Sequence, residues 1–183
     1  AIAKKHDIFL IFDEVYREFV YDGAQHFSVM QVPNIEQNAI MIDSVSKRFS
    51  MCGARIGWVV SKNKEVMKSI LKFAQARLSP PTYSQIGAEK AFDVPETYFE
   101  EVLKEYTQRR NVLIKALQKI EGVRVSMPKG AFYCIAELPI ENAEDFCIWL
   151  LDCFSVENET VMLAPAEGFY ASPGLGRNQV RIA

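Results

Sequence analysis

Three short apolar segments limit the folds open to this chain more than any other feature. Residues 8–12 and 39–44 each contain a nearly continuous apolar run that is too short for a buried helix. Such runs are typical of strands covered on both faces in a parallel sheet. Residues 55–60 form a third expected strand, and helical periodicity follows at 64–78 until Ser79-Pro80-Pro81 stops it. The predicted fold class is therefore α/β.

The pattern changes in the second half of the chain. A further helix is expected over 83–92, and Asp93-Val94-Pro95-Glu96 has the composition of a helix N-terminus. Apolar residues then recur at steps of three and four, which predicts a long amphipathic helix that reaches Glu121 and is ended by Gly122. The segments expected beyond it are strands at 123–127, 131–137 and 161–164 and a helix at 143–153.

These patterns predict three parts. Residues 1–78 belong to a sheet with helices, residues 79–121 form a helical interdomain linker that includes the long helix, and residues 122–183 form a smaller α+β domain. Short strands alternating with one helix distinguish this last part from the first sheet.

Composition excludes several classes of function. The formal net charge is -2 and no long basic run occurs, which argues against a nucleic-acid partner. No segment approaches the roughly 20 apolar residues of a membrane span. The four cysteines form no Cys-x-x-Cys pair, which favours reduced, mostly buried thiols and a cytoplasmic location. His6 and His26 lie far apart without clustered ligands, so we expect no metal site and two surface or loop histidines.

Chemically active side chains follow the first two expected strands. Asp13 ends the first, and Lys47 lies just beyond the end of the second. Ligands of open α/β sheets gather at the carboxyl ends of the strands. Pyridoxal 5'-phosphate (PLP) needs an amine, a carboxylate facing its ring nitrogen, a donor to its ring oxygen and a cation for its phosphate. Lys47, Asp13, Tyr16 and Arg55 provide these four groups, which predicts a PLP site.

Each of these residues also has an ordinary structural interpretation. Asp13 could cap a turn after its strand, which is a common use of aspartate. A single lysine is most often solvated, and Arg181 could lie on the solvated face of a strand. The order of these residues along the chain, and no one of them alone, favours the functional interpretation.

Four motifs, in a fixed order, resemble one protein family. They are Asp13-Glu14-Val15-Tyr16, the segment from Ser44-Val45-Ser46-Lys47 to Arg55-Ile56-Gly57-Trp58, Pro128-Lys129-Gly130-Ala131-Phe132-Tyr133, and Val180-Arg181-Ile182-Ala183. Together they resemble the class I/II aminotransferases of PLP fold type I. The resemblance implies the C-terminal portion of such an enzyme, truncated at both ends. Residues 1–78 would be the C-terminal part of a large PLP-binding domain with a mostly parallel sheet.

The resemblance also implies roles for individual residues. Lys47 would form the Schiff base with PLP and then act as general base, Asp13 would face the pyridine nitrogen, and Tyr16 would bond the ring oxygen. Ser44 and Arg55 would bind the phosphate, and the role of Ser46 stays open.

The closing motif implies a substrate contact. Arg181 would bind the substrate α-carboxylate, because a planar guanidinium suits a carboxylate. Arg177 is a rival in a glycine-rich turn, where exposure is expected. Residues 165–170 (Pro-Ala-Glu-Gly-Phe-Tyr) depart from the usual Pro-Gly-x-x-Phe-Gly of the family, so side-chain specificity could differ there.

The expected function is transfer of an amino group between an amino acid and a 2-oxo acid. Alternatives within the same fold are a carbon–sulfur lyase or an aminocyclopropane carboxylate synthase. Another is a regulatory protein that keeps an aminotransferase-like sensor domain. The resemblance further implies a homodimer for the full-length protein and an inactive fragment for this chain alone. The particular amino acid is left open.

Overall fold

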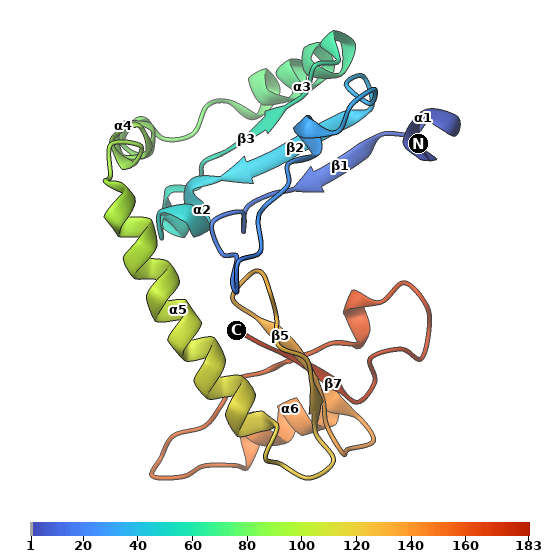
Figure 1. Ribbon diagram of the computed structural model, residues 1–183, viewed down its shortest axis with the longest axis vertical. Helices are drawn as coiled ribbons and strands as arrows, with labels where there is room; N and C mark the ends of the chain where they lie inside the picture. Colours follow the sequence, from blue (N-terminus) through green and yellow to red (C-terminus); the bar gives the residue numbers. More distant parts are fainter. Residues whose placement is uncertain (1) are drawn as a thin grey trace. The chain divides into compact units, whose positions relative to one another are not determined.

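The computed structural model describes residues 2–183 (Figure 1). The chain divides into two compact units, with the boundary between Glu101 and Val102. The division lies inside the longest helix, α5 (Glu96–Leu117). The three-part division predicted at residues 78 and 121 stays a prediction.

The first unit contains a mixed three-stranded sheet in the order β1-β2-β3. β1 (Leu10–Asp13) pairs in parallel with β2 (Ala39–Ser44), and Asp13 lies opposite Ile42. β3 (Gly57–Val60) pairs with β2 in the antiparallel direction. The three predicted strands are present with shorter bounds for the first and third, and β2 has the bounds expected.

The central strand β2 is covered on both faces. Ala39 and Met41 pack with Val29 and Ile35 of the loop between β1 and β2, in which one 3-10 turn, η1 (Val29–Gln31), occurs. The alternate side chains of β2 face α3 (Lys64–Arg77), whose apolar residues share a groove with them. Side chains of a strand alternate between its two faces, and both faces of β2 have packing partners. The buried core of this sheet therefore lies at β2.

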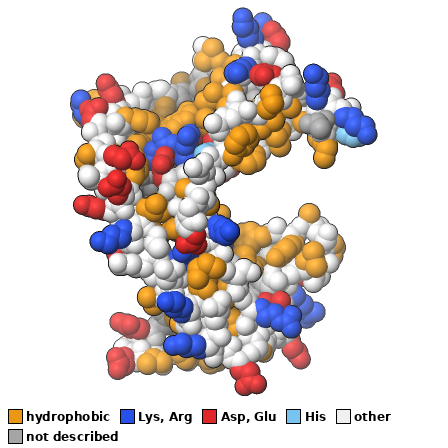
Figure 2. Space-filling model, in the orientation of Figure 1, with side chains coloured by type: hydrophobic (Ala, Val, Ile, Leu, Met, Phe, Trp, Pro, Cys, Tyr) orange, Lys and Arg blue, Asp and Glu red, His pale blue; other side chains and the backbone are white. Residues whose placement is uncertain are grey.

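The edge strand β1 differs from its prediction. Leu10, Ile11 and Phe12 are 37%, 63% and 42% exposed, although a strand buried on both faces was expected. β1 has a neighbour on one side only, and no element among residues 2–183 covers both of its faces. Figure 2 shows hydrophobic side chains gathered over this part of the unit. An apolar run predicts a strand, but it does not show which segment packs on the faces of that strand.

Three further helical segments follow the sheet strands in the first unit. Their bounds are α2 (Val45–Arg48), η2 (Cys52–Ala54) and α4 (Thr82–Ala91), and a short α1 (Ile2–Lys5) precedes β1. Val45 and Phe49 of the α2 region pack against Ala88 and Ala91 of α4 in one buried cluster. This packing fixes the short helix α2 at the end of β2.

The second unit is an antiparallel sheet with one helix. Its strands lie in the order β4-β5-β7-β6. Their bounds are β4 (Arg124–Val125), β5 (Cys134–Glu137), β6 (Ala164–Pro165) and β7 (Gln179–Ile182). α6 (Ala143–Asp152) packs on one face, where Ala136, Ala143, Cys147 and Val180 form the buried core.

The C-terminal end of α5 was predicted wrongly. The helix ends at Leu117, four residues before the expected Glu121. Lys119 and Ile120 donate to carbonyls three residues back, so the chain tightens into turns before Gly122 is reached. Gly122 has φ +81, and a Cβ there would lie 2.9 Å from Pro139 Cβ. Gly122 is therefore required by the turn and does not end the helix itself.

The cysteines are all unpaired, but only half of them are buried. Cys134 and Cys147 lie in the core of the second unit, where burial raises the pKa of both thiols. Cys52 and Cys153 are exposed, contrary to the expectation of mostly buried thiols. Within residues 2–183 no helix has the length and apolarity that crossing a membrane requires.

Candidate functional site

Lys47 is positioned by the junction between β2 and α2. Ser44 ends the strand in an extended conformation, and its hydroxyl accepts a hydrogen bond from the Ser46 N–H at 3.1 Å. This N-cap starts α2, and Val45, which is fully buried, anchors the helix. Lys47 is half-buried on α2. The sequence therefore places the lysine one turn beyond the end of the central strand.

Asp13 and Tyr16 lie at the same edge of the sheet. Asp13 is the last residue of β1, and the Glu14 N–H donates to the Ile42 carbonyl at 2.8 Å, which continues the pairing with β2. The exposed Asp13 carboxylate accepts from the Val15 N–H at 3.1 Å, the local turn bond that its structural interpretation predicts. Tyr16 follows in this turn and is half-buried. Asp13 and Ser44 are the last residues of β1 and β2. Because the two strands are parallel, both residues lie at the same edge of the sheet.

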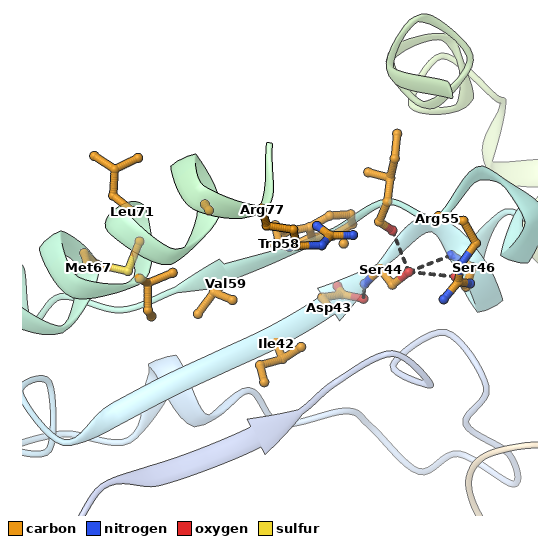
Figure 3. A pocket seen from close by; sticks show the side chains of 14 residues that line it. Ile42, Asp43, Ser44, Ser46, Arg55, Trp58, Val59, Met67, Leu71 and Arg77 are labelled. Carbon is orange, nitrogen blue, oxygen red and sulfur yellow. Dashed lines mark hydrogen bonds between the residues drawn. The ribbon is translucent and has the colours of Figure 1, made fainter. Parts of the chain in front are cut away.

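Ser44 and Arg55 line one pocket of about 580 Å³ (Figure 3). The Ser44 hydroxyl lies within hydrogen-bonding distance of the Ile56 carbonyl, at 2.7 Å, and of the Ser46 hydroxyl, at 2.8 Å. Arg55 is exposed and donates to the Cys52 carbonyl at 2.7 Å. Hydroxyls and a guanidinium thus converge at one end of the pocket, where an anionic oxygen could bind. Lys47, Asp13 and Tyr16 do not line this pocket.

Gly57 lines the same pocket and has a steric reason to be glycine. A Cβ at this position would lie 2.9 Å from the Asp43 carbonyl oxygen, closer than real Cβ contacts. At Gly53 a Cβ would meet nothing within 4 Å. Among the described residues, Gly57 therefore meets a steric limit that Gly53 does not.

Asp43 is a buried acid that the sequence did not single out. It is 1% exposed, and its carboxylate contacts Arg48 at 3.2 Å and Arg17 at 3.9 Å. Burial raises the pKa of Asp43, although the Ser44 N–H and both arginines oppose the increase. Arg48 also contacts Glu18 at 3.1 Å. This ionic network lies next to Lys47 in the sequence. Its one sequence signal was an aspartate, Asp43, near the end of an apolar strand.

Glu14 is a second buried acid, and it organises the loop that follows β1. Its carboxylate accepts from the Ser28 hydroxyl at 2.8 Å and the Val29 N–H at 2.9 Å, and it bonds His26 at 2.9 Å. Burial favours a raised pKa for Glu14, but the hydrogen bonds from His26, Ser28 and Val29 outweigh it and lower the pKa. His26 is therefore a half-buried loop histidine with a structural partner.

Arg181 lies on β7 in the second unit. It pairs with Ile135 of β5 and Ala164 of β6, whereas its neighbour Val180 points into the buried core. Arg181 is consequently on the sheet face opposite the core and is half-buried. The rival Arg177 is exposed in its turn, as expected. Arg181 belongs to the second unit, whereas Lys47 belongs to the first.

The residues present fit the chemistry of PLP. The first unit presents a lysine amine, an aspartate carboxylate and a tyrosine hydroxyl near one sheet edge, together with serine hydroxyls and a guanidinium in a pocket that Gly57 also lines. Hydroxyl and guanidinium donors are suited to phosphate oxygens. An amine, a carboxylate, hydroxyls and a guanidinium are the chemical groups that binding of this cofactor requires.

Comparison with known proteins identifies the family. The model of aminotransferase class I and II matches residues 1–182. The chain is 31% identical over 186 residues to an aspartate aminotransferase of Pyrococcus horikoshii, covering 100% of this chain and 45% of that protein. The chain therefore belongs to the class I and II aminotransferase family.

Two further relatives show the range of this similarity. A (5-formylfuran-3-yl)methyl phosphate transaminase of Methanocaldococcus jannaschii is 34% identical over 177 residues, with 96% of this chain and 45% of that protein covered. The solved aromatic aminotransferase of Pyrococcus horikoshii superposes with a TM-score of 0.82 at 29% identity, covering 100% of this chain and 47% of the other. The chain thus spans about half the length of the relatives it matches.

Proposed function

We propose that the whole protein is a PLP-dependent aminotransferase that moves an amino group between an amino acid and a 2-oxo acid. One observation supports this most directly. The parallel strands β1 and β2 end at the same edge of the sheet, and they carry Asp13 and the segment with Lys47 to that edge. Family membership supports the same reaction class.

Bound PLP supplies a protonated pyridine ring that withdraws electrons from the substrate α-carbon. In this proposal the Lys47 amine would hold the cofactor and would accept the substrate α-proton as a general base. The Asp13 carboxylate would keep the ring nitrogen protonated, and the Tyr16 hydroxyl would donate a hydrogen bond to the ring oxygen.

Phosphate binding is assigned to the pocket residues. Within residues 2–183 Arg55 donates one hydrogen bond, to the Cys52 carbonyl, so its remaining N–H groups can donate to phosphate oxygens. Ser44 would turn its proton from the Ile56 carbonyl toward the phosphate, and Ser46 can then donate to Ser44 or to the phosphate. Arg181 of the second unit would bind the substrate α-carboxylate.

Assembly and location form part of the same proposal. The family resemblance supports a homodimer, which sedimentation of the whole protein would test. Four unpaired cysteines are usual in a reducing compartment and support a cytoplasmic location.

An amino-donor screen of the whole PLP-loaded protein tests the proposed reaction. We expect product from at least one amino acid with 2-oxoglutarate as acceptor, and loss of nearly all turnover in Lys47→Ala. Lys62→Ala, which removes an exposed lysine, serves as the matched control and should retain turnover. Release of ammonia or sulfide without formation of a new amino acid would assign the protein to a lyase reaction instead.

A further inference from the structure

The guanidinium of Arg181 has no hydrogen-bond or ion-pair partner within the part of the chain that the structure describes. Its contacts are with two aromatic rings. The guanidinium carbon lies 4.9 Å from the ring centroid of Phe169 and 5.5 Å from that of Tyr133. Arg181 is half-buried, so its five N–H groups are partly withdrawn from water without being paired. Such an arrangement favours an anionic ligand.

Contact with ring faces leaves the plane of the guanidinium available. A cation within about 6 Å of a ring centroid is attracted by the ring quadrupole. Arginine can stack on a ring while its N–H groups still point outward in the plane of the fork. A carboxylate approaching in that plane can therefore accept two parallel hydrogen bonds from a side chain that is already oriented.

The loop that carries Phe169 is itself held in place. Phe169 ends the turn η3 (Glu167–Phe169), and the next residue, Tyr170, donates its hydroxyl to Gln179 Oε1 on β7 at 2.6 Å. A Cβ at Gly176, whose φ is +75, would lie 2.5 Å from a Tyr170 ring carbon, so the ring occupies space that only glycine leaves. The Ala166 N–H donates to the Gln179 carbonyl at 2.9 Å. The departure at Tyr170 thus ties η3 to the strand that carries Arg181.

The second ring is held by packing against α5. Phe132 stacks on Tyr106 of α5 with centroids 5.3 Å apart, and Tyr133 meets Phe132 edge-on at 6.3 Å. Arg110, also on α5, donates to the Pro128 carbonyl at 3.0 Å and so fixes the start of this loop. Both rings near Arg181 are therefore held by contacts of their own.

We propose that Phe169 and Tyr133 are positioning residues that clamp the Arg181 guanidinium for binding the α-carboxylate of the substrate, with Tyr170, Gly176 and Gln179 fixing Phe169. This inference rests on the proposed function, because Arg181 binds a carboxylate only if the protein binds amino and 2-oxo acids. It assigns roles to the Pro-Lys-Gly-Ala-Phe-Tyr motif and to the departure at Tyr170.

The test uses the whole PLP-loaded protein with pyruvate as the carboxylate probe. Calorimetry gives the Kd for pyruvate, and kinetics give KM and kcat for an active amino acid. Phe169→Leu should weaken pyruvate binding and raise KM by about 3- to 10-fold, the size of one cation–π contact, with little change in kcat. Phe169→Trp and Tyr133→Phe keep a ring and should behave like the wild type, whereas Tyr133→Leu should match Phe169→Leu. Phe27→Leu is the control, because Phe27 has a similar exposure of 60% and belongs to the other unit.

A mutant cycle separates the clamp from a general structural role. In an Arg181→Ala background, Phe169→Leu should cause no further loss, because the ring acts through the guanidinium. An equal loss in that background, or an unchanged Kd in Phe169→Leu, would overturn the clamp. Pyruvate binding that weakens in Phe169→Leu, in a protein without amino transfer, would overturn the proposed reaction but support the contact between the carboxylate and the clamped Arg181. A wild-type protein that does not bind pyruvate would overturn both.

Discussion

Within the Asp13-Glu14-Val15-Tyr16 motif, Glu14 has a structural role that Asp13 does not share. It is 2% exposed, and three groups from residues 26–29 bind its carboxylate. Asp13 beside it is exposed and accepts one local hydrogen bond. Side-chain alternation at a strand end thus gives two adjacent acids opposite environments. Glu14 stabilises the loop, whereas Asp13 remains accessible for chemistry.

This difference predicts an acid-dependent loss of stability. Since the pKa of Glu14 is lowered in the fold, its contribution is present above its unfolded pKa and is lost as pH falls through the folded value. Glu14→Gln should lower the free energy of unfolding at pH 7 by about 1–3 kcal/mol and flatten the pH dependence below pH about 4.5. Denaturant midpoints of the whole protein between pH 3 and 7 would measure both effects.

Ser28→Ala is the matched control for Glu14→Gln. It removes one hydrogen bond to the same carboxylate and should cost about 1 kcal/mol with the acid-dependent loss retained. An unchanged pH profile in Glu14→Gln would contradict the role given to the ionised carboxylate.

Replacing Arg181 should impair recognition of the substrate α-carboxylate. Loss of a hydrogen bond to a charged group costs about 1.5–3 kcal/mol, so Arg181→Ala should lower kcat/KM for amino acids by at least roughly tenfold. Arg181→Lys should recover part of this loss, because the charge returns without the planar fork. Amines without an α-carboxylate should lose much less. Equal losses for both substrate classes, with circular dichroism unchanged, would show that Arg181 supports the fold.

At the scale of the element, α2 depends on its surroundings. A helix of four residues is too short to be stable by its own hydrogen bonds, because helix nucleation is costly. The Ser44 cap and the burial of Val45 against α4 provide what the helix lacks. Lys47 is therefore placed by tertiary packing as well as by its distance from the strand.

Removing that packing should loosen the lysine. Val45→Ala deletes buried methyl groups and should destabilise the protein by about 1–3 kcal/mol. It should also weaken PLP binding, because α2 carries Lys47, and an absorbance titration with PLP measures this. Val112→Ala on α5, where the valine is 71% exposed, should leave both quantities unchanged. Normal PLP affinity in Val45→Ala would show that α2 does not need this anchor.

The pairing of β2 with β3 limits the size of the side chain at position 57. Gly57→Ala places a Cβ 2.9 Å from the Asp43 carbonyl oxygen, so the strands must separate at a cost of about 1–3 kcal/mol. Gly53→Ala meets nothing within 4 Å and should stay within about 0.5 kcal/mol of the wild type. Thermal unfolding of the two variants compares the positions directly. Equal stability would mean that the sheet accommodates the added methyl group.

The whole molecule leaves apolar surface open along β1. Its strand residues are more than one-third exposed, and a groove of about 520 Å³ between the sheet and α3 is mostly apolar. Exposed apolar patches of this kind mark surfaces that other protein segments cover. The relatives are about twice as long as this chain, so they contain as much polypeptide again.

The 183-residue chain alone should accordingly be a poor enzyme. It contains the candidate residues for PLP, but its β1 edge is uncovered, so we expect weak PLP binding and negligible transamination. Titration of the purified chain with PLP, followed by absorbance and by an amino-transfer assay, measures both. The whole protein under the same conditions is the control. Tight stoichiometric binding with turnover by the chain alone would show that residues 1–183 suffice.

The sequence by itself predicted most of the elements, their order and the candidate site, but it predicted no bounds for a strand at β7 and placed the strand near β6 at 161–164. Local periodicity predicted β2 with its observed bounds and α3 and α4 within a residue or two, because burial of one face repeats along each element. The order of chemically distinctive residues identified the family. The end of α5 was missed, because three-residue turn bonds at Lys119 and Ile120 leave little trace in the apolar pattern.

Only the tertiary structure decided which side chains are buried and which groups meet. Glu14 and Asp43 resemble exposed acids in the sequence, and their partners His26, Ser28 and Arg17 come from other segments. The rings of Phe169 and Tyr133 reach Arg181 from loops more than ten and forty positions away along the chain. Contacts between distant segments depend on strand pairing and packing, and the local apolar pattern of the sequence does not predict them. For the same reason the sequence predicted β1 as a strand but not its exposed faces.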